Sequence, residues 1–425
     1  MSVARLWVVS ELYHPEETST GYFLTRIAEG LAADYPVSVL CSQPTYSARG
    51  RRAPWRETRH GVDIHRCWAT TLDKDVLPLR LVNALTISLA LLVTAWRRFR
   101  RGDVVLVVTN PPFLPFVIRA AAALRGARCL LLIHDVYPEC LVAAGMVRRE
   151  ALLSRALARA TRRLYRSMER IVVLGRDMKA LVERKLAGRG PAIALIGHWS
   201  DVDEIRPVAR DTNRLLGELG LLDKFVVQYS GNMGRTHGLE TALEAARALA
   251  STTDVHFLFV GWGAKRALLE AAVRDEGLPN VTLRPIAPRE ELATSLGACD
   301  VTLISFVPGM AGVSVPSRLY NVLAAGRPLL AAADPESELA LLVGEHEVGW
   351  VVPPGDAPRL VEAILEARSD RGRLARFGAR ARAAAQGRFT LNASLAGYRA
   401  LLADIGFEAA GTALAPARRK ACASS

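Results

Sequence analysis

Residues 225–238 read FVVQYSGNMGRTHG, a segment that combines a strand with a phosphate-binding turn. Its first six residues form a mostly apolar run, which is typical of a buried strand. Gly231, Gly234 and Arg235 follow at once, before a helical pattern begins. Glycine lets the backbone approach an anion at the start of a helix, and arginine supplies a charge-assisted hydrogen-bond donor. The segment therefore predicts a strand, a cradle for phosphate and a helix.

The same alternation of short apolar runs and helical patterns extends in both directions from this segment. Continuous apolar strands joined by helical crossovers indicate parallel sheets that are covered by helices on both faces. Two successive series of such units predict two doubly wound α/β domains. The twelve predicted strands are 5–10, 37–41, 64–68, 104–109, 129–133, 171–174, 192–196, 225–230, 256–260, 281–285, 301–304 and 328–332.

Length and composition agree with two globular domains. The chain has 425 residues, of which 50% are hydrophobic and 23% charged, and this excludes a disordered or fibrous protein. The predicted domains are residues 1–200 and 201–388, and the polar segment 197–214 is the predicted linker. Residues 389–406 are predicted to form a helix that packs back toward the first domain, followed by a disordered tail at 407–425.

The net charge indicates which kinds of partner the protein could bind, and the cysteines indicate the redox state of its compartment. A net charge of +13 favours phosphates or a membrane surface, although an arginine-rich composition alone gives the same charge. No basic patch is interleaved with aromatic residues, so a nucleic-acid partner is not favoured. Cys41, Cys67, Cys129 and Cys299 lack metal-ligand spacing and are predicted to be buried free thiols in a reducing compartment. The N-terminus lacks the features of a signal peptide and is interpreted as a first strand.

Further predicted strand ends in the second domain carry turns that suit an anion. In a parallel sheet these ends share one edge. Gly261 and Gly263 follow the second strand of this domain, and Ser317 and Arg318 open a helix after the fourth. Ser317 is the predicted N-cap of that helix, whose free N–H groups suit a diphosphate. Each turn alone is equally compatible with an ordinary strand–helix connection, and the glycines do not form the GxGxxG pattern of dinucleotide-binding domains.

The first domain offers candidate residues at the equivalent edge. Gly21 stands at the start of a predicted helix after the first strand, where it permits the same backbone approach to an anion. His134 and Asp135 follow the fifth strand, before a proline-containing turn. Titratable residues that converge at the predicted cleft are candidates for chemistry, with a structural histidine and a capping aspartate as the alternative.

Six motifs resemble the retaining family 4 glycosyltransferases of the GT-B fold, most closely the subgroup that builds bacterial O-antigen, capsule and exopolysaccharide. They are YHPEETSTGYFLTRIAEGLA, HDVYPE, IGHWSDVDEIRP, YSGNMGRTHGLETALEA, VGWGAKRALLEAA, and VPSRLYNVLAAGRPLL with VVPPGD. They occur in family order over roughly residues 5–400. The resemblance implies two Rossmann-like domains that face a central cleft, and transfer of a sugar with retention from a UDP- or GDP-linked donor.

The resemblance also implies roles for the residues at matching positions. Gly21, Gly231 and Arg235 would contact the donor diphosphate, Ile286 would hold the base through its backbone, and His134 would lie near the transferred sugar or acceptor. The full predicted site comprises catalytic His134, Arg235 and Arg318; donor-binding Gly21, Gly231, Asn232, Gly234, Gly261, Gly263, Ile286, Ser317 and Asn321; and Asp135 and Glu16 on the acceptor side.

The chain departs from the family pattern at three places in this site. The broader family carries two glutamates eight residues apart where this chain has Val313 and Asn321. It carries a lysine shortly after the arginine of the phosphate loop, where this chain has only His237 nearby. In the subgroup an arginine often stands at the position of His134. Asn321 could still bond a ribose hydroxyl, and Arg318 could supply the missing charge.

The predicted mechanism uses no metal. Departure of a nucleoside diphosphate builds negative charge, which Arg235, Arg318 and two helix N-termini would stabilise. DxD strings occur at 73–75 and 201–203. Neither follows a strand end in the cleft, so both are predicted to be solvated or structural and not metal ligands.

The acceptor side depends on the interpretation of one apolar helix. Residues 81–96 form an apolar helical pattern, and the basic run RRFRR follows at 97–101. Asn83, Thr86, Thr94, Arg97 and Arg101 fall on one narrow stripe. One interpretation is a buried core helix, and the other is a helix that dips into a membrane beside basic headgroup contacts. The second, with the resemblance, predicts a polyprenyl-diphosphate-linked saccharide acceptor and a peripheral position on the cytoplasmic face of the membrane.

Two other functions stay open at this point. A nucleotide-sugar epimerase of the same fold would need extra acids in the cleft and no lipid-facing surface. A non-catalytic, membrane-associated scaffold would have kept the fold and lost the missing glutamates. Turnover of a nucleotide sugar separates the transferase from the scaffold.

Overall fold

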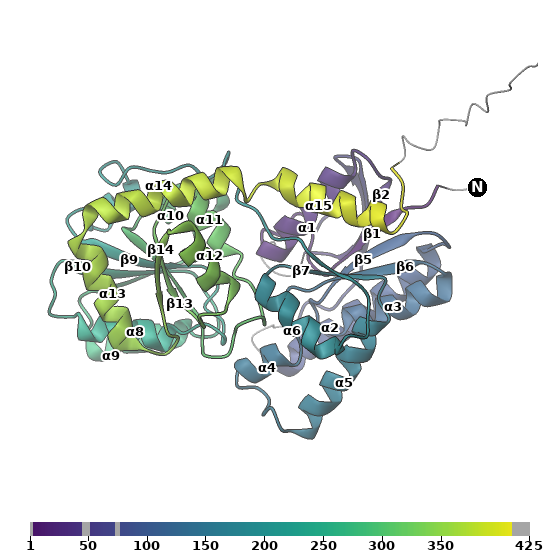
Figure 1. Ribbon diagram of the computed structural model, residues 1–425, viewed down its shortest axis with the longest axis horizontal. Helices are drawn as coiled ribbons and strands as arrows, with labels where there is room; N and C mark the ends of the chain where they lie inside the picture. Colours follow the sequence, from purple (N-terminus) through teal and green to yellow (C-terminus); the bar gives the residue numbers. More distant parts are fainter. Residues whose placement is uncertain (1–2, 45–51, 73–76, 410–425) are drawn as a thin grey trace, which may run out of the picture.

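Two α/β domains lie side by side in the computed structural model, which describes residues 3–44, 52–72 and 77–409 (Figure 1). The first domain has an eight-stranded sheet in the order β3-β4-β2-β1-β5-β6-β7-β8, in which only β3 with β4 is an antiparallel pair. The second has a parallel six-stranded sheet in the order β11-β10-β9-β12-β13-β14. The predicted fold class of two doubly wound domains is confirmed.

The strands follow the apolar runs of the sequence. Those of the first sheet are β1 (Leu6–Val9), β2 (Val37–Ser42), β3 (Arg56–Arg59), β4 (Val62–Cys67), β5 (Val104–Val108), β6 (Arg128–Leu132), β7 (Arg170–Val173) and β8 (Ile193–Leu195). Those of the second are β9 (Phe225–Ser230), β10 (Val255–Val260), β11 (Val281–Arg284), β12 (Val301–Ser305), β13 (Leu329–Ala332) and β14 (Gly349–Val352). Each predicted strand overlaps an observed one, and β3 and β14 are the two that the sequence did not predict.

Helices cover both faces of each sheet, which explains why the central strands are wholly buried. The first domain contains α1 (Ser19–Leu31), α2 (Leu77–Arg98), α3 (Leu114–Arg125), α4 (Glu139–Ala143), α5 (Leu152–Arg166) and α6 (Arg176–Leu186). The second contains α7 (Arg214–Glu218), α8 (Leu239–Ala248), α9 (Arg266–Glu276), the short 3-10 helix η1 (Arg289–Glu291), α10 (Leu292–Leu296), α11 (Arg318–Ala324), α12 (Glu338–His346), α13 (Ala357–Ser369) and α14 (Arg371–Gly387). A last helix, α15 (Leu391–Asp404), follows.

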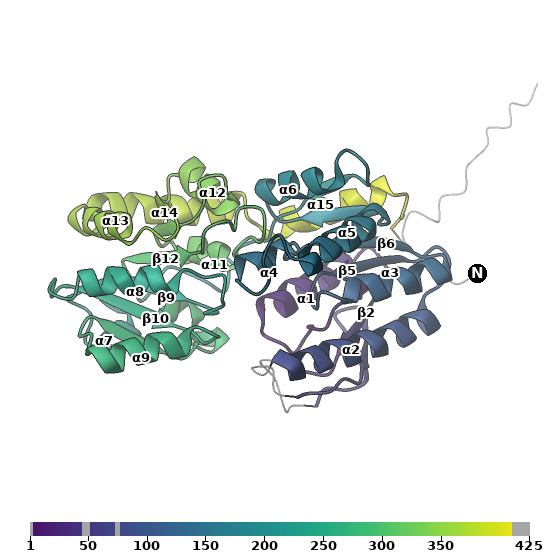
Figure 2. The same ribbon diagram turned by 90° about the horizontal axis from the view of Figure 1, so that it is seen from below.

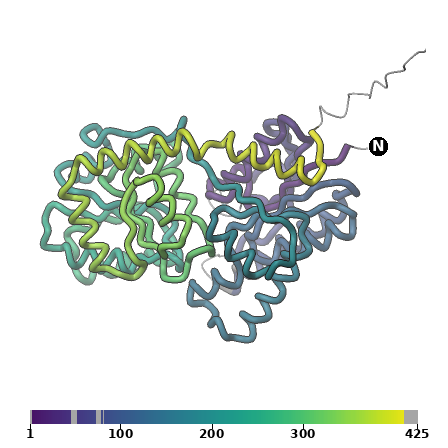
Figure 3. The backbone as a smooth tube through the Cα atoms, in the orientation of Figure 1, coloured from purple at the N-terminus to yellow at the C-terminus, as the bar shows by residue number. Residues whose placement is uncertain are grey.

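The chain crosses between the domains twice (Figure 3). The segment 197–214 makes the first crossing and buries Trp199 in the core of the first domain and Ile205 in that of the second. Helix α14 then lies along the second domain and leads into α15, which packs on α1 of the first. Gly30 permits this contact, because a Cβ there would lie 2.4 Å from a methyl carbon of Leu395. Two segments of the chain, 197–214 and the connection from α14 to α15, therefore join the domains.

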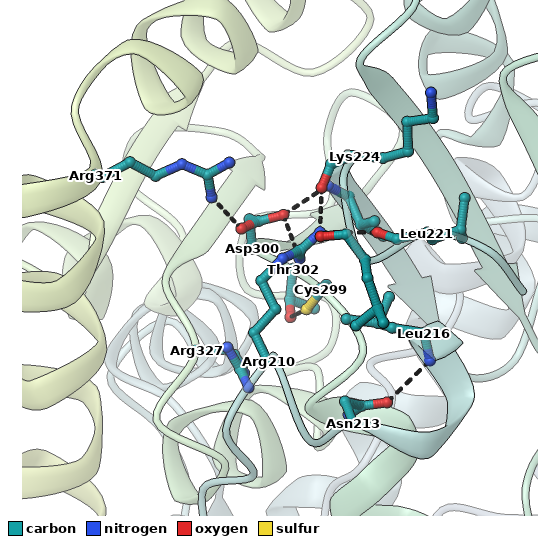
Figure 4. A network of polar contacts seen from close by, with 12 residues as sticks. Arg210, Asn213, Leu216, Leu221, Lys224, Cys299, Asp300, Thr302, Arg327 and Arg371 are labelled. Atoms are coloured by element: carbon teal, nitrogen blue, oxygen red, sulfur yellow. Dashed lines mark hydrogen bonds and ion pairs between the residues drawn. The ribbon is translucent and has the colours of Figure 1, made fainter. Parts of the chain in front are cut away.

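A polar network fixes the end of the linker to the second domain (Figure 4). The buried Asp300 accepts from Arg210 at 2.7 Å and from the backbone N–H of Val226 at 2.7 Å, and it pairs with Arg371 of α14. Asn213 caps α7 by accepting from the backbone N–H of Leu216. A buried carboxylate is thus neutralised by two arginines from different segments.

Four cysteines are buried, and the packed part of the chain extends to Phe407. Cys41, Cys67, Cys129 and Cys299 are free and buried, as predicted. Phe407 is buried against Tyr35, so packing continues past the predicted start of the tail at residue 407. Residues 410–425 and the DxD string at 73–75 lie outside the described residues.

Candidate active site between the domains

The turn after β9 receives an arginine from another element. Arg318, at the start of α11, lies with its guanidinium carbon 4.6 Å from the centre of the Tyr229 ring, and its Nη2 donates to the Asn232 carbonyl at 3.1 Å. Gly231 has a φ of +129°, and a Cβ there would lie 3.3 Å from the Arg318 guanidinium carbon. Nη1 of Arg318 is buried without a hydrogen-bond partner in the described part of the chain. The structure therefore brings Gly231, Asn232 and Arg318 together and leaves one donor free.

His237 lies on the same turn, and its Nε2 faces the Arg318 guanidinium without a hydrogen-bond acceptor from the described residues between them. The backbone N–H of Gly234 donates to Nδ1 at 3.0 Å, and Nε2 lies 3.0 Å from Nη2 of Arg318. Burial and the charge of Arg318 hold the pKa of His237 well below its usual range, so the ring is neutral and carries one proton. Since a backbone N–H can only donate, that proton resides on Nε2, where it faces a second donor. An anionic oxygen between Nε2 and Arg318 would accept from both.

Gly261 and Gly263 support this turn from the next one along the sheet. Both have positive φ, of +148° and +141°. A Cβ on Gly261 would lie 2.0 Å from the Gly231 carbonyl oxygen, and one on Gly263 would lie 2.6 Å from the Asn232 side-chain oxygen. Only glycine allows the two turns to pack backbone against backbone at this distance. The packing of the two turns alone thus accounts for both glycines.

Three other predicted residues of the site have no side-chain hydrogen bond or ion pair to this cluster within the described residues. Arg235 is exposed and has no hydrogen bond or ion pair within the described ranges. Ile286 is 50% exposed, two residues beyond the end of β11. Asn321 is half-buried in α11, and its side chain makes no hydrogen bond to the described residues. Their roles toward a donor remain predictions.

The first turns of two helices meet across the domain interface. Ser19, the first residue of α1, donates its hydroxyl to the Ser317 hydroxyl at 2.7 Å. Ser317 stands at the N-cap position of α11, as predicted, but its φ and ψ are helical and its side chain accepts no bond from the helix. Helix N-termini carry partial positive charge, so this contact places positive ends from both domains side by side.

The predicted Gly21 and Glu16 also meet, on the first-domain side. A Cβ on Gly21 would lie 2.6 Å from the Glu16 carbonyl oxygen, so glycine is needed for the turn before α1 to fold against the helix. The N–H of Gly21 donates to the Thr18 side chain, which caps α1. Glu16 is buried, with 5% of its surface exposed.

His134 lies at the end of β6, beside the same helix start. Its Nδ1 is 3.5 Å from the hydroxyl oxygen of Thr20, and its Nε2 is buried without a partner among the described residues. Its ring meets that of His198 edge to face, with centroids 5.7 Å apart. Burial lowers the pKa of His134 to about 4, so the ring is neutral at neutral pH. A neutral imidazole with one free nitrogen can exchange a hydrogen bond with a substrate but brings no charge.

Asp135 holds an uncompensated carboxyl at the interface. Its backbone N–H donates to the Thr109 hydroxyl at 3.3 Å, and its backbone pairs with Ser314 of the second domain. Its carboxyl has neither a hydrogen bond nor an ion pair with any residue that the structure describes. Burial raises its pKa from 3.8 to about 6. A carboxyl with a pKa close to neutral is suited to accept a proton.

The interface accounts for the departure at Val313. Val136, one residue after Asp135, donates its backbone N–H to the Val313 carbonyl at 2.9 Å. The Val313 side chain is buried in an apolar cluster of the second domain. A glutamate at this position would place its charge in that cluster, so this chain uses the position for docking the domains.

The DxD string at 201–203 lies in the linker, and its first residue has a structural role. Asp201 accepts from the Tyr22 hydroxyl of α1 and lies 3.3 Å from Arg289 of the second domain. The Arg289 guanidinium also stacks on the Tyr22 ring at 4.0 Å. Asp203 is exposed. The carboxylate of Asp201 is therefore occupied by a contact between the domains.

Sequence reasoning missed Ser19, Thr20 and His198 as parts of this site. His198 stacks on Phe23 of α1 with centroids 3.8 Å apart, and burial holds its pKa well below the usual range. The motif IGHWSD contains His198, but nothing local in the sequence shows that it lies beside His134. Ser19 and Thr20 are ordinary residues of a helix start, and only their partners in the fold mark them.

Basic side chains and the starts of two helices thus gather where the two domains of this α/β protein meet. Comparison with known proteins identifies the family. Residues 20–199 match the family described as "Glycosyl transferase 4-like domain", and residues 224–370 match "Glycosyl transferases group 1". The chain belongs to this glycosyltransferase family. The predicted family is therefore confirmed.

Two relatives match most of the chain. It is 31% identical over 374 residues to a "Probable glycosyltransferase WbjE" of Pseudomonas aeruginosa, covering 86% of this chain and 90% of that protein. It is 27% identical over 372 residues to a "Putative colanic acid biosynthesis glycosyl transferase WcaI" of Escherichia coli strain K12, covering 84% and 90%.

Solved structures share the GT-B fold. Sucrose-phosphate synthase from Thermosynechococcus elongatus superposes with a TM-score of 0.76 at 19% identity, covering 95% of this chain and 99% of that one. Anabaena Alr3699/HepE in complex with UDP and glucose superposes with a TM-score of 0.69 at 15% identity, covering 94% and 100%. These matches confirm the architecture of two facing Rossmann-like domains.

Proposed function

We propose that this glycosyltransferase moves a sugar from a nucleotide-sugar donor, with retention, to a saccharide carried on a polyprenyl diphosphate, in the synthesis of a cell-surface polysaccharide. The observation that carries the donor half is the pair of unsatisfied donors at Arg318 and His237. Both lie where the turn after β9 meets α11, and an oxygen of a diphosphate would satisfy both at once. The fold neighbour HepE binds UDP, which agrees with such a donor.

The donors would act mainly when the sugar leaves. Charge develops on the nucleoside diphosphate as its bond to the sugar breaks, and fixed donors stabilise that charge without reorganisation. Arg318 supplies a free Nη1 and His237 supplies Nε2–H, so this pair takes the place of the family's lysine. Arg235, on the same turn, is exposed and free to move onto the diphosphate. These groups would perform the neutralisation for which other transferases use a cation.

The acceptor half of the proposal rests on Asp135 and His134. A carboxyl with a raised pKa is a suitable proton acceptor for the attacking hydroxyl, and the free Nε2 of His134 can orient a sugar hydroxyl. Glu16 lies in the turn before α1, against Gly21. Retention is the stereochemical outcome that the family resemblance implies. Nuclear magnetic resonance of the new anomeric centre tests it, and an inverted product contradicts it.

A peripheral position on the cytoplasmic face of the membrane follows from a lipid-linked acceptor. Residues Leu81–Arg98 of α2 are long and apolar enough to span a membrane, with a mean hydropathy of 1.2, and 28% of that stretch is buried. One side of α2 packs on the first sheet, where Ile87, Leu91 and Ala95 are buried. This packing fits a helix on the membrane surface better than one across it. The relative WcaI is named for biosynthesis of colanic acid, which agrees with polysaccharide synthesis.

A screen of nucleotide sugars by thermal shift is the most direct test of the donor. A donor that binds only the folded protein raises the melting temperature by mass action. Wild type should respond to one nucleotide class, and Arg318→Ala should lose the response. Stabilisation of both proteins to the same degree would remove Arg318 from the site.

Turnover then separates a transferase from a scaffold. Arg235→Ala should lower turnover by about 100-fold or more, the loss typical of one transition-state donor. Arg376→Ala, an exposed arginine of the second domain, is the matched control. Activity within a few-fold of wild type would exclude Arg235. Activity that EDTA abolishes and magnesium or manganese restores would contradict the metal-free mechanism.

A further inference from the structure

We propose that helices α2, α3 and α5 form a docking face for the interfacial region of an anionic lipid bilayer, with the arginines of α5 as its charged part. The proposal rests on the lipid-linked acceptor proposed above and adds the surface that reaches the lipid. The three helices lie side by side on one side of the first sheet, since α2 contacts α3 and α3 contacts α5 (Figure 2). Their outward sides are called the three-helix face.

Helix α2 has the uncharged polar residues of its stripe, Asn83, Thr86 and Thr94, turned inward, while Arg97 is exposed. Asn83 accepts from the Thr70 hydroxyl at 2.8 Å and from the Leu72 backbone N–H at 3.0 Å, and Thr94 accepts from the Cys67 thiol at 3.3 Å. The outward side carries large apolar residues, all of them exposed: Leu81, Val82, Leu85, Leu89, Val93 and Trp96. An ordinary surface helix shows the reverse arrangement. The outward side of α2 therefore suits an apolar medium.

Helix α5 supplies a row of free positive charge. Arg148 and Arg149 precede it, and Arg155, Arg159, Arg162 and Arg163 are exposed along it. None of these six side chains makes a hydrogen bond or ion pair with a residue in the described ranges. At the start of the helix, Leu152 and Leu153 are 81% and 58% exposed. Unpaired arginines beside exposed apolar residues are typical of surfaces that bind anionic membranes.

An arginine-rich composition alone does not explain where the net positive charge lies in this chain. Residues 1–200 contain 30 lysines and arginines against 16 aspartates and glutamates, while residues 201–425 contain 25 against 26. Arginine is frequent in both parts, but only the second part balances it with acids. Helices α2, α3 and α5 together contain ten arginines and no aspartate or glutamate. The positive charge is thus concentrated on the part of the chain that exposes apolar residues.

Exposed apolar residues beside unpaired arginines favour an anionic bilayer over a second copy of the chain or a nucleic acid. A second copy of this chain docked through the same face would oppose arginines to arginines. A nucleic acid would satisfy the arginines and leave the apolar side of α2 in water. An anionic bilayer offers phosphates to the α5 row and acyl chains to α2. Along the chain, Asp135 at the interface is followed by α4 and then by α5, so 16 residues (136–151) connect the site where the acceptor would react to the three-helix face.

Vesicle flotation of the full chain tests the charged part. The variant replaces four α5 arginines by glutamine, and a charge-matched control replaces four exposed arginines of the second domain: Arg155, Arg159, Arg162 and Arg163, against Arg274, Arg359, Arg376 and Arg380. Wild type and control should float with vesicles of phosphatidylcholine and phosphatidylglycerol, and less so at high salt. The α5 variant should bind them at least about 100-fold more weakly. Equal binding of variant and control overturns the proposal.

A second pair of variants tests the apolar part. Leu85→Ser with Leu89→Ser changes the outward side of α2, and Leu222→Ser with Leu268→Ser removes similarly exposed leucines from the second domain. The first variant should lose vesicle binding and the second should keep it. Circular dichroism and transfer to a short water-soluble acceptor show that each variant is folded. Loss of binding in both pairs, or wild-type dimers that dissociate on changing this face, overturns the proposal.

The same assays separate this proposal from the proposed function. If wild type binds anionic vesicles but transfers no sugar to any acceptor, the docking face stands and the proposed reaction fails. If it transfers sugar to the soluble acceptor but does not bind vesicles, the docking face fails and the reaction stands. Binding to pure phosphatidylcholine that equals binding to the anionic vesicles removes the role of the α5 arginines.

Discussion

Replacing Asp135 with asparagine should stabilise the fold at neutral pH, although the residue lies at the proposed reaction site. Burial raises the pKa of this carboxyl from 3.8 to about 6, and no cation or donor in the described chain compensates it. The unfolded chain ionises at the ordinary pKa. Folding at pH 7.5 therefore places a charge where it is disfavoured, and the difference between the two pKa values corresponds to about 3 kcal/mol. Asparagine is neutral at every pH and carries no such penalty.

The sign of the pKa change fixes the pH dependence of the Asp135→Asn effect. The folded pKa lies above the unfolded one, so the carboxyl destabilises the protein in full above about pH 6. The penalty fades as the pH falls from 6 to 3.8, because the folded protein is then protonated and the unfolded chain becomes so. The gain in unfolding free energy should be about 3 kcal/mol at pH 7.5, about half of that at pH 5, and close to zero below pH 4.

Urea unfolding of the two proteins at pH 7.5 and pH 5 measures this difference. Asp211→Asn, which changes an exposed carboxylate of the linker, is the control and should have no effect at either pH. Transfer of sugar should fall at least about tenfold in Asp135→Asn, since the proton acceptor is lost. Equal midpoints for wild type and Asp135→Asn at pH 7.5, or a gain that does not shrink at pH 5, would refute the reasoning.

Three further variants test other parts of the structure. Because burial lowers the pKa of His134 to about 4, wild type should lose about 3 kcal/mol of stability between pH 6.5 and pH 4; His134→Gln should not, as acid unfolding curves will show. Arg318→Lys keeps the charge but not the planar donor edge, so kcat/KM should fall by about 100-fold with an unchanged circular dichroism spectrum. Asp300→Asn leaves Arg210 and Arg371 facing each other without their carboxylate and should lower the unfolding free energy by about 3 kcal/mol, seen as a lower Tm with donor binding retained.

The sequence predicted most strands because their signal is local. An apolar run such as 225–230 between polar turns is recognisable without knowledge of its neighbours, and all twelve predicted strands exist. Strand β3 has the charged sequence RETR and lies at the sheet edge, where it pairs only with β4. Strand β14, GWVV, has only three apolar residues after a glycine. Both depend on a neighbouring strand that the local sequence does not reveal.

The periodicity of α2 shows a different limit of sequence reasoning. The pattern located a narrow stripe that includes Asn83, Thr86 and Thr94, but periodicity does not tell which side of a helix meets the sheet. A polar stripe ordinarily faces water. Here the segment after β4 offers Thr70 and the Leu72 backbone as hydrogen-bond partners, so Asn83 turns inward, and Leu85 and Leu89 are exposed.

The site was predicted as separate turns, and its assembly depends on distant partners. Gly231 and Arg318 were each found from local chemistry, yet their contact spans two elements of the second domain. Ser19 and Ser317 are 298 residues apart in the chain. The N-cap position of Ser317 was predicted correctly, but its side chain contacts Ser19 and makes no capping bond to α11. Nothing local in the sequence shows that a second helix start would compete for its hydroxyl.

Asp300 and Asp135 differ in how the fold compensates their charge, and only Asp135 lowers the stability of the protein. Asp300 is buried with two arginines and a backbone N–H around it, so its charge contributes to holding the linker in place. Asp135 is held at the interface by its backbone, and its carboxyl is left without a cation. The fold thus neutralises the carboxylate of Asp300 but leaves that of Asp135 uncompensated. The Asp135 carboxyl and Nε2 of the adjacent His134 both lack a hydrogen-bond partner among the described residues. Uncompensated polar groups that gather at one interface indicate a substrate site, because a bound ligand provides the missing partners.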